Sequence, residues 1–244
     1  MSADVLLKIG GVPVYVDEDE HLSWTGEFTV DGDGSPRCYG PEGTDPLDWL
    51  ANAGYPGNWW GICTHNQQSS GYPILQGGTN PWPGYHVSTT AYVNSKYYYA
   101  DPRRYLDSEN VLFAVIPGNV RKAVAGICKG CRARVTDKRS GKAVDCVIGD
   151  IGPSDHMGEG SIKLAGEFGL DLSPKYGGSA DESRFLWECW PGVAAEGMNE
   201  ERERCEKLKS LLQRVLDSFV NGRRVREGID ISLRRECEWE EDME

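Results

Sequence analysis

The chain has 244 residues, and 38 Asp and Glu against 26 Lys and Arg give it a formal net charge of −12. This balance, without a basic stripe, argues against nucleic-acid binding through phosphate contacts. Plentiful aromatic and β-branched residues argue against disorder, and no run of 18 apolar residues is present to span a membrane. We therefore expect an acidic globular protein of one large domain, with or without an appendage.

The N-terminal region predicts short strands. Apolar residues at 5–9 and 12–16 flank a Gly-Gly turn, which is the pattern of a β-hairpin. A third strand is expected at 26–30, and it leads into a Gly-rich turn at 31–34 that carries two aspartates. The chain is therefore expected to begin with a β-structure that ends in an acidic turn.

A long loop follows. Residues 40–84 are dominated by Gly, Pro, Asn and aromatic residues, and one short helix is expected at 46–52. Connections of this length within a compact domain are usually functional. We therefore expect the long loop to contribute to a site.

Regular structure resumes after the long loop. Strands are expected at 85–91, 111–116, 132–136, 143–149 and 185–190, and a short helix at 161–168. The turn-rich link between the third and fourth of these strands predicts a hairpin. Many short strands and few helices predict a mainly β (α+β) domain over residues 1–198.

The composition changes at Asn199, which is a suitable helix N-cap. Apolar side chains then recur at helical spacing, and they predict an amphipathic helix over 199–221. A short strand at 229–233 and an acidic tail at 236–244 follow. We expect residues 199–244 to form a C-terminal appendage, whose helix is a candidate surface for assembly or self-association.

The eight cysteines are interpreted mainly as free, partly buried thiols. Cys128 and Cys131 have the spacing of half a zinc site, but no second Cys-x-x-Cys follows them. Two ordinary thiols beside a turn are the alternative. We expect no metal and no cofactor.

Two acids flank a tight loop in the most informative stretch. The strand at 143–149 delivers Asp150 at its end, and Glu159 lies just before the helix at 161–168. Glycoside hydrolysis needs such a pair, because one carboxylic acid protonates the leaving oxygen and the other carboxylate activates water or attacks directly. The alternative is local, with Asp150 capping its own turn and Glu159 complementing the helix dipole.

This stretch resembles the active-site region of the fungal endo-chitosanases, glycoside hydrolase family 75. The residues that carry the resemblance are Gly149, Asp150, Gly158, Glu159, Gly160, Ser161, Ile162, Leu164 and Ala165. Residues 29–34 are similar to the family's early Asp-x-Asp-Gly element, and residues 112–118 to its central strand. The resemblance covers residues 26–170 and implies a six-stranded double-psi-like β-barrel with long loops.

The resemblance further implies that Asp150 and Glu159 are the catalytic acids of an inverting endo-glycosidase. In this assignment Asp150 is the general base and Glu159 the general acid. The helix expected directly after Glu159 opposes the assignment, because a helix N-terminus stabilises an ionised carboxylate.

Other residues are expected to bind the sugar chain. Asp31 and Asp33 match the family's early element and are interpreted as carboxylates that bind amino-sugar cations; Asx-turns are the alternative. Flat aromatic rings pack well against the C–H faces of sugars. The remaining predicted binding residues are Trp59, Trp60, Trp82, Tyr85 and Thr89. Closing the core under the long loop is the alternative role of the adjacent pair of tryptophans.

An acidic protein would attract chitosan, which is a polycation. The expected substrate is therefore a chitosan-like, β-1,4-linked amino-sugar polysaccharide. The alternatives are a phage or bacterial hydrolase of cell-wall glycan, and a non-catalytic carbohydrate-binding or virion structural protein on the same scaffold. Without a recognisable export signal we expect synthesis in the cytoplasm, with release by lysis or on a phage particle. No nucleic-acid or membrane partner is expected.

Overall fold

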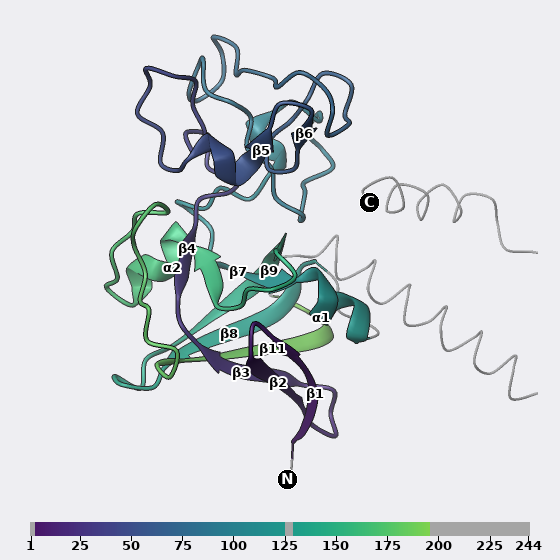
Figure 1. The fold of residues 1–244 in the computed structure, drawn as a ribbon, viewed down its shortest axis with the longest axis vertical. Coiled ribbons are helices and arrows are strands. Elements are labelled where there is room, and N and C mark those ends of the chain that lie inside the picture. The colour runs from purple at the N-terminus through teal and green to yellow at the C-terminus, as the bar shows by residue number, and fades with distance from the viewer. Residues whose placement is uncertain (1–2, 125–128, 196–244) are drawn as a thin grey trace, which may run out of the picture. The chain divides into compact units, whose positions relative to one another are not determined.

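The computed structural model describes residues 3–124 and 129–195 (Figure 1). The chain divides into two compact units, Met1–Cys205 and Glu206–Glu244, and all described residues belong to the first. The appendage expected from residue 199 onward, with its helix and strand, lies outside the described residues. In the described ranges no helix is long and apolar enough to cross a membrane.

A nine-stranded mixed sheet is the main element of the first unit. Its strands, in spatial order, are β1 (Asp4–Ile9), β2 (Val12–Val16), β3 (Leu22–Gly26), β11 (Phe185–Ala194), β8 (Cys131–Asp137), β9 (Ala143–Gly152), β7 (Phe113–Pro117), β10 (Glu159–Ser161) and β4 (Thr29–Asp31). The helices are short: α1 (Gly118–Ala123), α2 (Ile162–Glu167) and the 3-10 turns η1 (Leu50–Ala53) and η2 (Pro102–Arg104). The mainly β prediction is confirmed.

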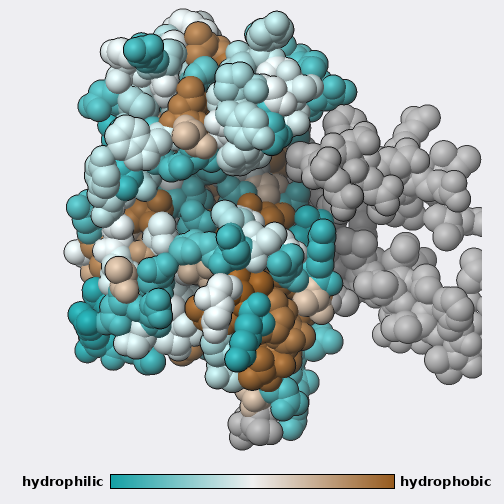
Figure 2. All heavy atoms as spheres, in the orientation of Figure 1, coloured by the Kyte–Doolittle hydropathy of each residue, from teal (hydrophilic) through white to brown (hydrophobic). Residues whose placement is uncertain are grey.

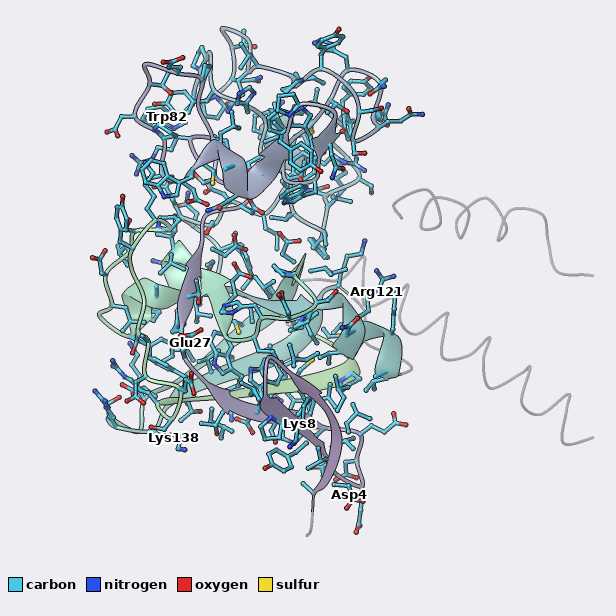
Figure 3. All side chains as sticks on the ribbon, in the orientation of Figure 1. Asp4, Lys8, Glu27, Trp82, Arg121 and Lys138 are labelled. Carbon is cyan, nitrogen blue, oxygen red and sulfur yellow. The ribbon has the colours of Figure 1, made fainter. Side chains whose placement is uncertain are left out.

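The sheet is strongly curled. β4 follows β3 after only Glu27 and Phe28, although five strands lie between them in the sheet order. In a flat sheet, six spacings of ~4.8 Å would separate the two strands by ~29 Å, whereas three residues span at most ~11 Å. The sheet must therefore bend its β4 edge back towards β3. Figures 1 and 3 show β3 and β4 as one bent segment, with Glu27 at the junction.

Aromatic side chains fill the interior of the curl. Trp24 of β3 is in register with Trp187 of β11, and the two rings stack with their centroids 6.2 Å apart. Phe28, from the β3–β4 junction, packs edge-on against Phe185 at 5.4 Å. All four side chains are almost completely buried. Burial of each side chain contributes on the order of 2–3 kcal/mol to the stability of the fold. These four residues therefore form a core that stabilises the pairing of β3 with β11.

The segment between β4 and β7 contains little regular structure. It contains the two-stranded sheet of β5 (Gly54–Tyr55) and β6 (Asn58–Trp59), and isolated bridges such as Ile62↔Ser88. Two small apolar clusters stabilise it in place of a sheet; one contains Cys38, Tyr39, Ala53, Trp59 and Ile62, and the other Cys63, Val87 and Tyr105. The long-loop prediction is confirmed, and we call residues 35–105 the loop region.

Several element predictions need correction. The strand expected at 85–91 is reduced to isolated bridges, because its partners are other loop segments rather than the sheet. The helix expected at 46–52 is only the 3-10 turn η1. The strand expected at 26–30 is divided at its second and third residues, because its two parts pair at different places in the sheet. The hairpins of β1–β2 and β8–β9 and the helix α2 agree with the sequence prediction.

Candidate active site

The two predicted acids lie on strands that flank β7. Val115 of β7 is in register with Asp150 of β9, and Ala114 is in register with Gly160 of β10. The antiparallel pairing of β7 with β10 therefore places Glu159 across from the other edge of Val115. Two strand spacings put the Cα atoms of Asp150 and Glu159 ~10 Å apart. The fold thus places the two acids across from each other, at the two edges of a single strand.

Asp150 is buried, with 9% of its surface exposed. Its Oδ1 accepts hydrogen bonds from the backbone N–H of Ala91, at 2.8 Å, and of Ile151, at 2.7 Å. Burial and the neighbouring charge of Asp31 nevertheless raise the pKa of Asp150 to about 8, against the opposing effects of these hydrogen bonds and of Lys129. Ionisation of Asp150 therefore costs free energy, and the two hydrogen bonds fix the orientation of its carboxyl group.

Glu159 is half-buried at the start of β10. Burial, and then the charges of Asp31 and Asp150, raise the pKa of Glu159 well above its usual value. A raised pKa favours the protonated form of the carboxyl group, which is the form that a general acid requires.

The helix-dipole objection to Glu159 as an acid does not hold in this structure. The helix α2 begins three residues after Glu159, at Ile162. Ser161 is the N-cap, and its Oγ accepts the N–H of Leu164 at 3.2 Å. Glu159 is thus a strand residue outside the first turn of the helix, where the dipole acts.

Asp31 and Asp33 complete a cluster of four carboxyl groups with the pair. Asp31 ends β4, and its Oδ1 accepts the N–H of Asp33 at 2.7 Å in an Asx-turn. Burial raises the pKa of Asp31 to about 6; burial and the charge of Asp31 raise that of Asp33 well above its usual value. Asp33 also accepts hydrogen bonds from the side chains of Ser88, at 3.3 Å, and Tyr39. The Asx-turn expected as the alternative therefore occurs, and the binding of amino-sugar cations by Asp31 and Asp33 stays a prediction.

Asp48 is a fifth acid that the sequence did not indicate. It is buried, and its carboxylate accepts the backbone N–H of Trp49 at 2.7 Å and the side-chain amide of Asn52 at 2.9 and 3.0 Å. Its charge is one of the causes that raise the pKa of Asp31 and of Glu159. The hydrogen-bonded pair of Asp48 and Asn52 is local in sequence, but nothing local connects Asp48 to the four carboxyl groups.

The predicted aromatic binding residues have different environments. Trp59 is only 8% exposed within the small core of the loop region, so its ring cannot stack on a sugar. Trp60 is 58% exposed, and its indole N–H donates to the carbonyl of Asn52 at 2.8 Å. The alternative role expected for this pair, closing the core under the long loop, is therefore correct for Trp59 but not for Trp60.

Trp82 and Tyr85 form a second aromatic pair in the loop region. Their rings meet edge to face at 5.6 Å, and the guanidinium of Arg37 lies 5.4 Å from the Trp82 ring centre. Figure 3 shows Trp82 in the loop region, away from the labelled Glu27 of the β3–β4 junction. The hydroxyl of Tyr85 donates to the carbonyl of Asp45, and the backbone N–H of Thr89 donates to that of Gly61. The contacts of these residues are thus with the loop region itself.

Figure 2 shows the molecular surface hollowed between the loop region and the sheet, with hydrophilic residues at the hollow. The acids of the site come from both sides of this hollow, because Asp31 ends β4 and Asp150 lies on β9, whereas Asp48 belongs to the loop region. Within the ranges 3–124 and 129–195, no three His, Cys, Asp or Glu side chains are arranged to hold a metal ion. Cys131 is buried on β8, and Cys128 lies outside the described residues, so the structure does not test a zinc site at this pair.

Comparison of the sequence with models of known protein families found no match, and no curated protein sequence matches it either. The carboxyl cluster and the resemblance over residues 26–170 are therefore the two observations from which a function can be proposed.

Proposed function

We propose that the protein is an endo-acting glycoside hydrolase that cleaves β-1,4 linkages of a chitosan-like amino-sugar polysaccharide, with Asp150 and Glu159 as its acid–base pair. The observation that carries the proposal is the placing of these two acids on either side of Val115, each with a raised pKa. Strongly raised pKa values that come from burial together with charged neighbours are typical of catalytic acids and bases. The resemblance to glycoside hydrolase family 75 supports the same pair.

The two acids have distinct roles in the proposed mechanism. Glu159 donates its proton to the glycosidic oxygen as the bond from that oxygen to the anomeric carbon breaks. Asp150 accepts a proton from a water molecule whose oxygen forms the new bond to the same carbon. The two N–H groups on Asp150 Oδ1 oppose the effect of burial on its pKa, which is about 8, so Asp150 becomes the ionised base that this mechanism needs as the pH approaches that value.

The spacing of the pair is compatible with inversion of configuration. The Cα atoms lie ~10 Å apart across β7, and inverting enzymes hold their two carboxyl groups ~6.5–9.5 Å apart, with a water molecule between the base and the sugar. In retaining enzymes the two carboxyl groups are closer, at ~5 Å. We therefore propose that the product is released with inverted anomeric configuration.

The remaining carboxyl groups support a cationic substrate. The charges of Asp31 and Asp48 raise the pKa of Glu159, and the charges of Asp150 and Glu159 in turn raise the pKa of Asp33. Such a concentration of negative charge lowers the free energy of an amino-sugar cation at the same place. We propose that Asp31 and Asp33 hold ammonium groups of the substrate.

We also propose that the curled sheet contains the six-stranded double-psi-like barrel that the resemblance implies. The bent segment of β3 and β4 would count as one strand, and β11, β8, β9, β7 and β10 would complete the ring. The hairpin of β1 and β2 would then be an addition at the edge of β3. The short β3–β4 connection supports this closure.

A non-catalytic carbohydrate-binding or virion structural protein is the second candidate, and the burial of Asp150 is the observation that favours it. A general base must reach a water molecule, and only 9% of Asp150 is exposed. Glycosidase function remains the stronger proposal, because a group of mutually repelling carboxyl groups destabilises a fold and is retained where chemistry needs it.

The proposed function is tested by the release of reducing ends from chitosan, chitin, peptidoglycan and carboxymethyl cellulose. We expect release from chitosan, and NMR of the first products should show the inverted anomer. Cleavage of peptidoglycan alone would identify a cell-wall hydrolase. Binding to a polysaccharide without cleavage of any of the four would establish the non-catalytic candidate.

A further inference from the structure

Two exposed aromatic rings from distant parts of the chain meet next to the carboxyl cluster. Trp49 is 49% exposed and Tyr176 is 77% exposed. Their rings pack edge to face, with centroids 6.1 Å apart and an angle of 81° between the planes. Large apolar rings that remain exposed although they are ordered against each other are typical of ligand-binding surfaces.

Lys175 holds the two rings in place. Its ammonium group donates to the backbone carbonyl of Pro46 at 2.7 Å, and the same group lies 4.6 Å from the centre of the Trp49 ring. The segment that carries Tyr176 is thereby fastened to the segment that carries Trp49. A pair of rings that is ordered before binding loses little conformational entropy when a ligand arrives.

Both segments are joined to the carboxyl cluster. Trp49 directly follows Asp48, whose carboxylate accepts the Trp49 N–H and whose charge raises the pKa of Glu159. On the other side, the ring of Pro174 lies 3.0 Å from the position that a Cβ would take at Gly32, in the turn of the two cluster aspartates. The aromatic pair is therefore continuous with the proposed catalytic site.

We propose that Trp49 and Tyr176 form a sugar-binding subsite that takes a pyranose unit of the polysaccharide next to the unit at the carboxyl pair. The inference rests on the proposed glycosidase function and assigns part of its substrate binding. The C–H face of the pyranose packs on the exposed rings, and the ammonium of Lys175 is placed to donate to a hydroxyl group of the same unit. The subsite matters only for substrates long enough to occupy it.

The test compares binding of chitosan hexasaccharide and disaccharide by calorimetry, in a Glu159→Gln background that prevents cleavage. We expect Trp49→Ala and Tyr176→Ala each to weaken hexasaccharide binding about 5- to 10-fold, which is the loss of one aromatic contact. Trp49→Phe should recover most of the affinity, because it keeps a ring. The matched control is Tyr98→Ala, which removes a ring that is 76% exposed elsewhere in the loop region.

Equal hexasaccharide affinity in Trp49→Ala, Tyr176→Ala and Tyr98→Ala would overturn the subsite, and so would the absence of hexasaccharide binding in the Glu159→Gln background. The proposed function is judged separately, by hydrolysis in the wild-type protein. If the wild-type protein hydrolyses chitosan and the variants bind the hexasaccharide as tightly as before, the proposed function stands and the subsite is rejected. If Trp49→Ala and Tyr176→Ala alone lose hexasaccharide binding while the wild-type protein hydrolyses nothing, the subsite stands and the enzymatic function is rejected.

Discussion

The carboxylate of Glu159 lies against the backbone of Gly152, two residues beyond Asp150 on β9. A Cβ at position 152 would lie 3.0 Å from Glu159 Oε2 and 2.9 Å from a methyl carbon of Val115. Both distances are shorter than van der Waals contact allows, so only glycine leaves room for the carboxylate over β7. The strand that supplies the proposed base therefore also sets the position of the proposed acid.

The substitution Gly152→Ala should displace Glu159 and lower kcat/KM by at least about 100-fold, because small misplacements of a catalytic group are costly. Gly152→Ala should also cost about 1–3 kcal/mol of stability, because its added methyl group meets a methyl carbon of the buried Val115 at 2.9 Å. Gly118→Ala is the matched control, because its added methyl group would meet a carbon of Ile151 at 3.8 Å, an ordinary contact. Wild-type kcat/KM in Gly152→Ala would remove Glu159 from the mechanism.

The roles of the acid pair can be separated by the leaving group. Glu159→Gln should abolish cleavage of chitosan but retain activity on an aryl glycoside, because a phenolate of low pKa departs without a proton. Asp150→Asn should abolish cleavage of both, because neither substrate reacts without an activated water molecule. The thermal midpoints of both variants should equal or exceed that of the wild type. The reverse pattern of activity would exchange the two roles, and full activity in either variant would remove the pair.

Stability should fall as the pH rises from about 4 to about 8. The pKa of Asp150 rises from an ordinary 3.8 to about 8 on folding, and that of Asp31 to about 6. The folded state therefore binds more protons than the unfolded state in this window, and linkage makes the free energy of unfolding decrease with pH there. Urea unfolding at several pH values measures the slope, and Asp150→Asn should reduce it.

Asp137 provides a control of opposite sign. Arg184 donates to its carboxylate at 3.0 and 3.2 Å and holds the pKa of Asp137 well below its usual range. A carboxyl group whose pKa is lowered on folding stabilises the folded state at pH values above its pKa in the unfolded chain. This stabilisation is lost only in strong acid. Asp137→Asn should therefore cost about 2 kcal/mol throughout pH 4–8 without changing the slope. A slope that is the same in the wild type and in Asp150→Asn would show that Asp150 does not titrate as proposed.

The sequence predicts local features of this protein well. The helix α2 follows from adjacent residues, and so do the hairpins, because their turns and apolar alternation are local. Asp150 and Glu159 could be selected for the same reason, since both lie within the short segment 150–159. The raised pKa values of the pair could not be predicted from the sequence, because the charges of Asp31 and Asp48 act on the pair from distant parts of the chain.

The aromatic residues show the limit of prediction from composition. An aromatic-rich loop indicates sugar binding, but it does not distinguish rings that fill a core from rings that remain exposed. Trp59 and Trp60 are neighbours in sequence with opposite environments, because Trp59 alone faces the apolar cluster of the loop region. Trp49 and Tyr176 were missed because their contact joins segments that are remote in sequence.

The opposite environments of these two neighbours lead to a direct test. Trp59→Ala should lower the free energy of unfolding by about 3 kcal/mol, because it leaves a cavity among Tyr39, Ala53 and Ile62. Trp60→Ala should cost less than about 1 kcal/mol, since more than half of its side chain already contacts solvent. Urea denaturation of both variants measures the difference. Equal losses would mean that the two rings share one environment, and the small core of the loop region would then not hold as described.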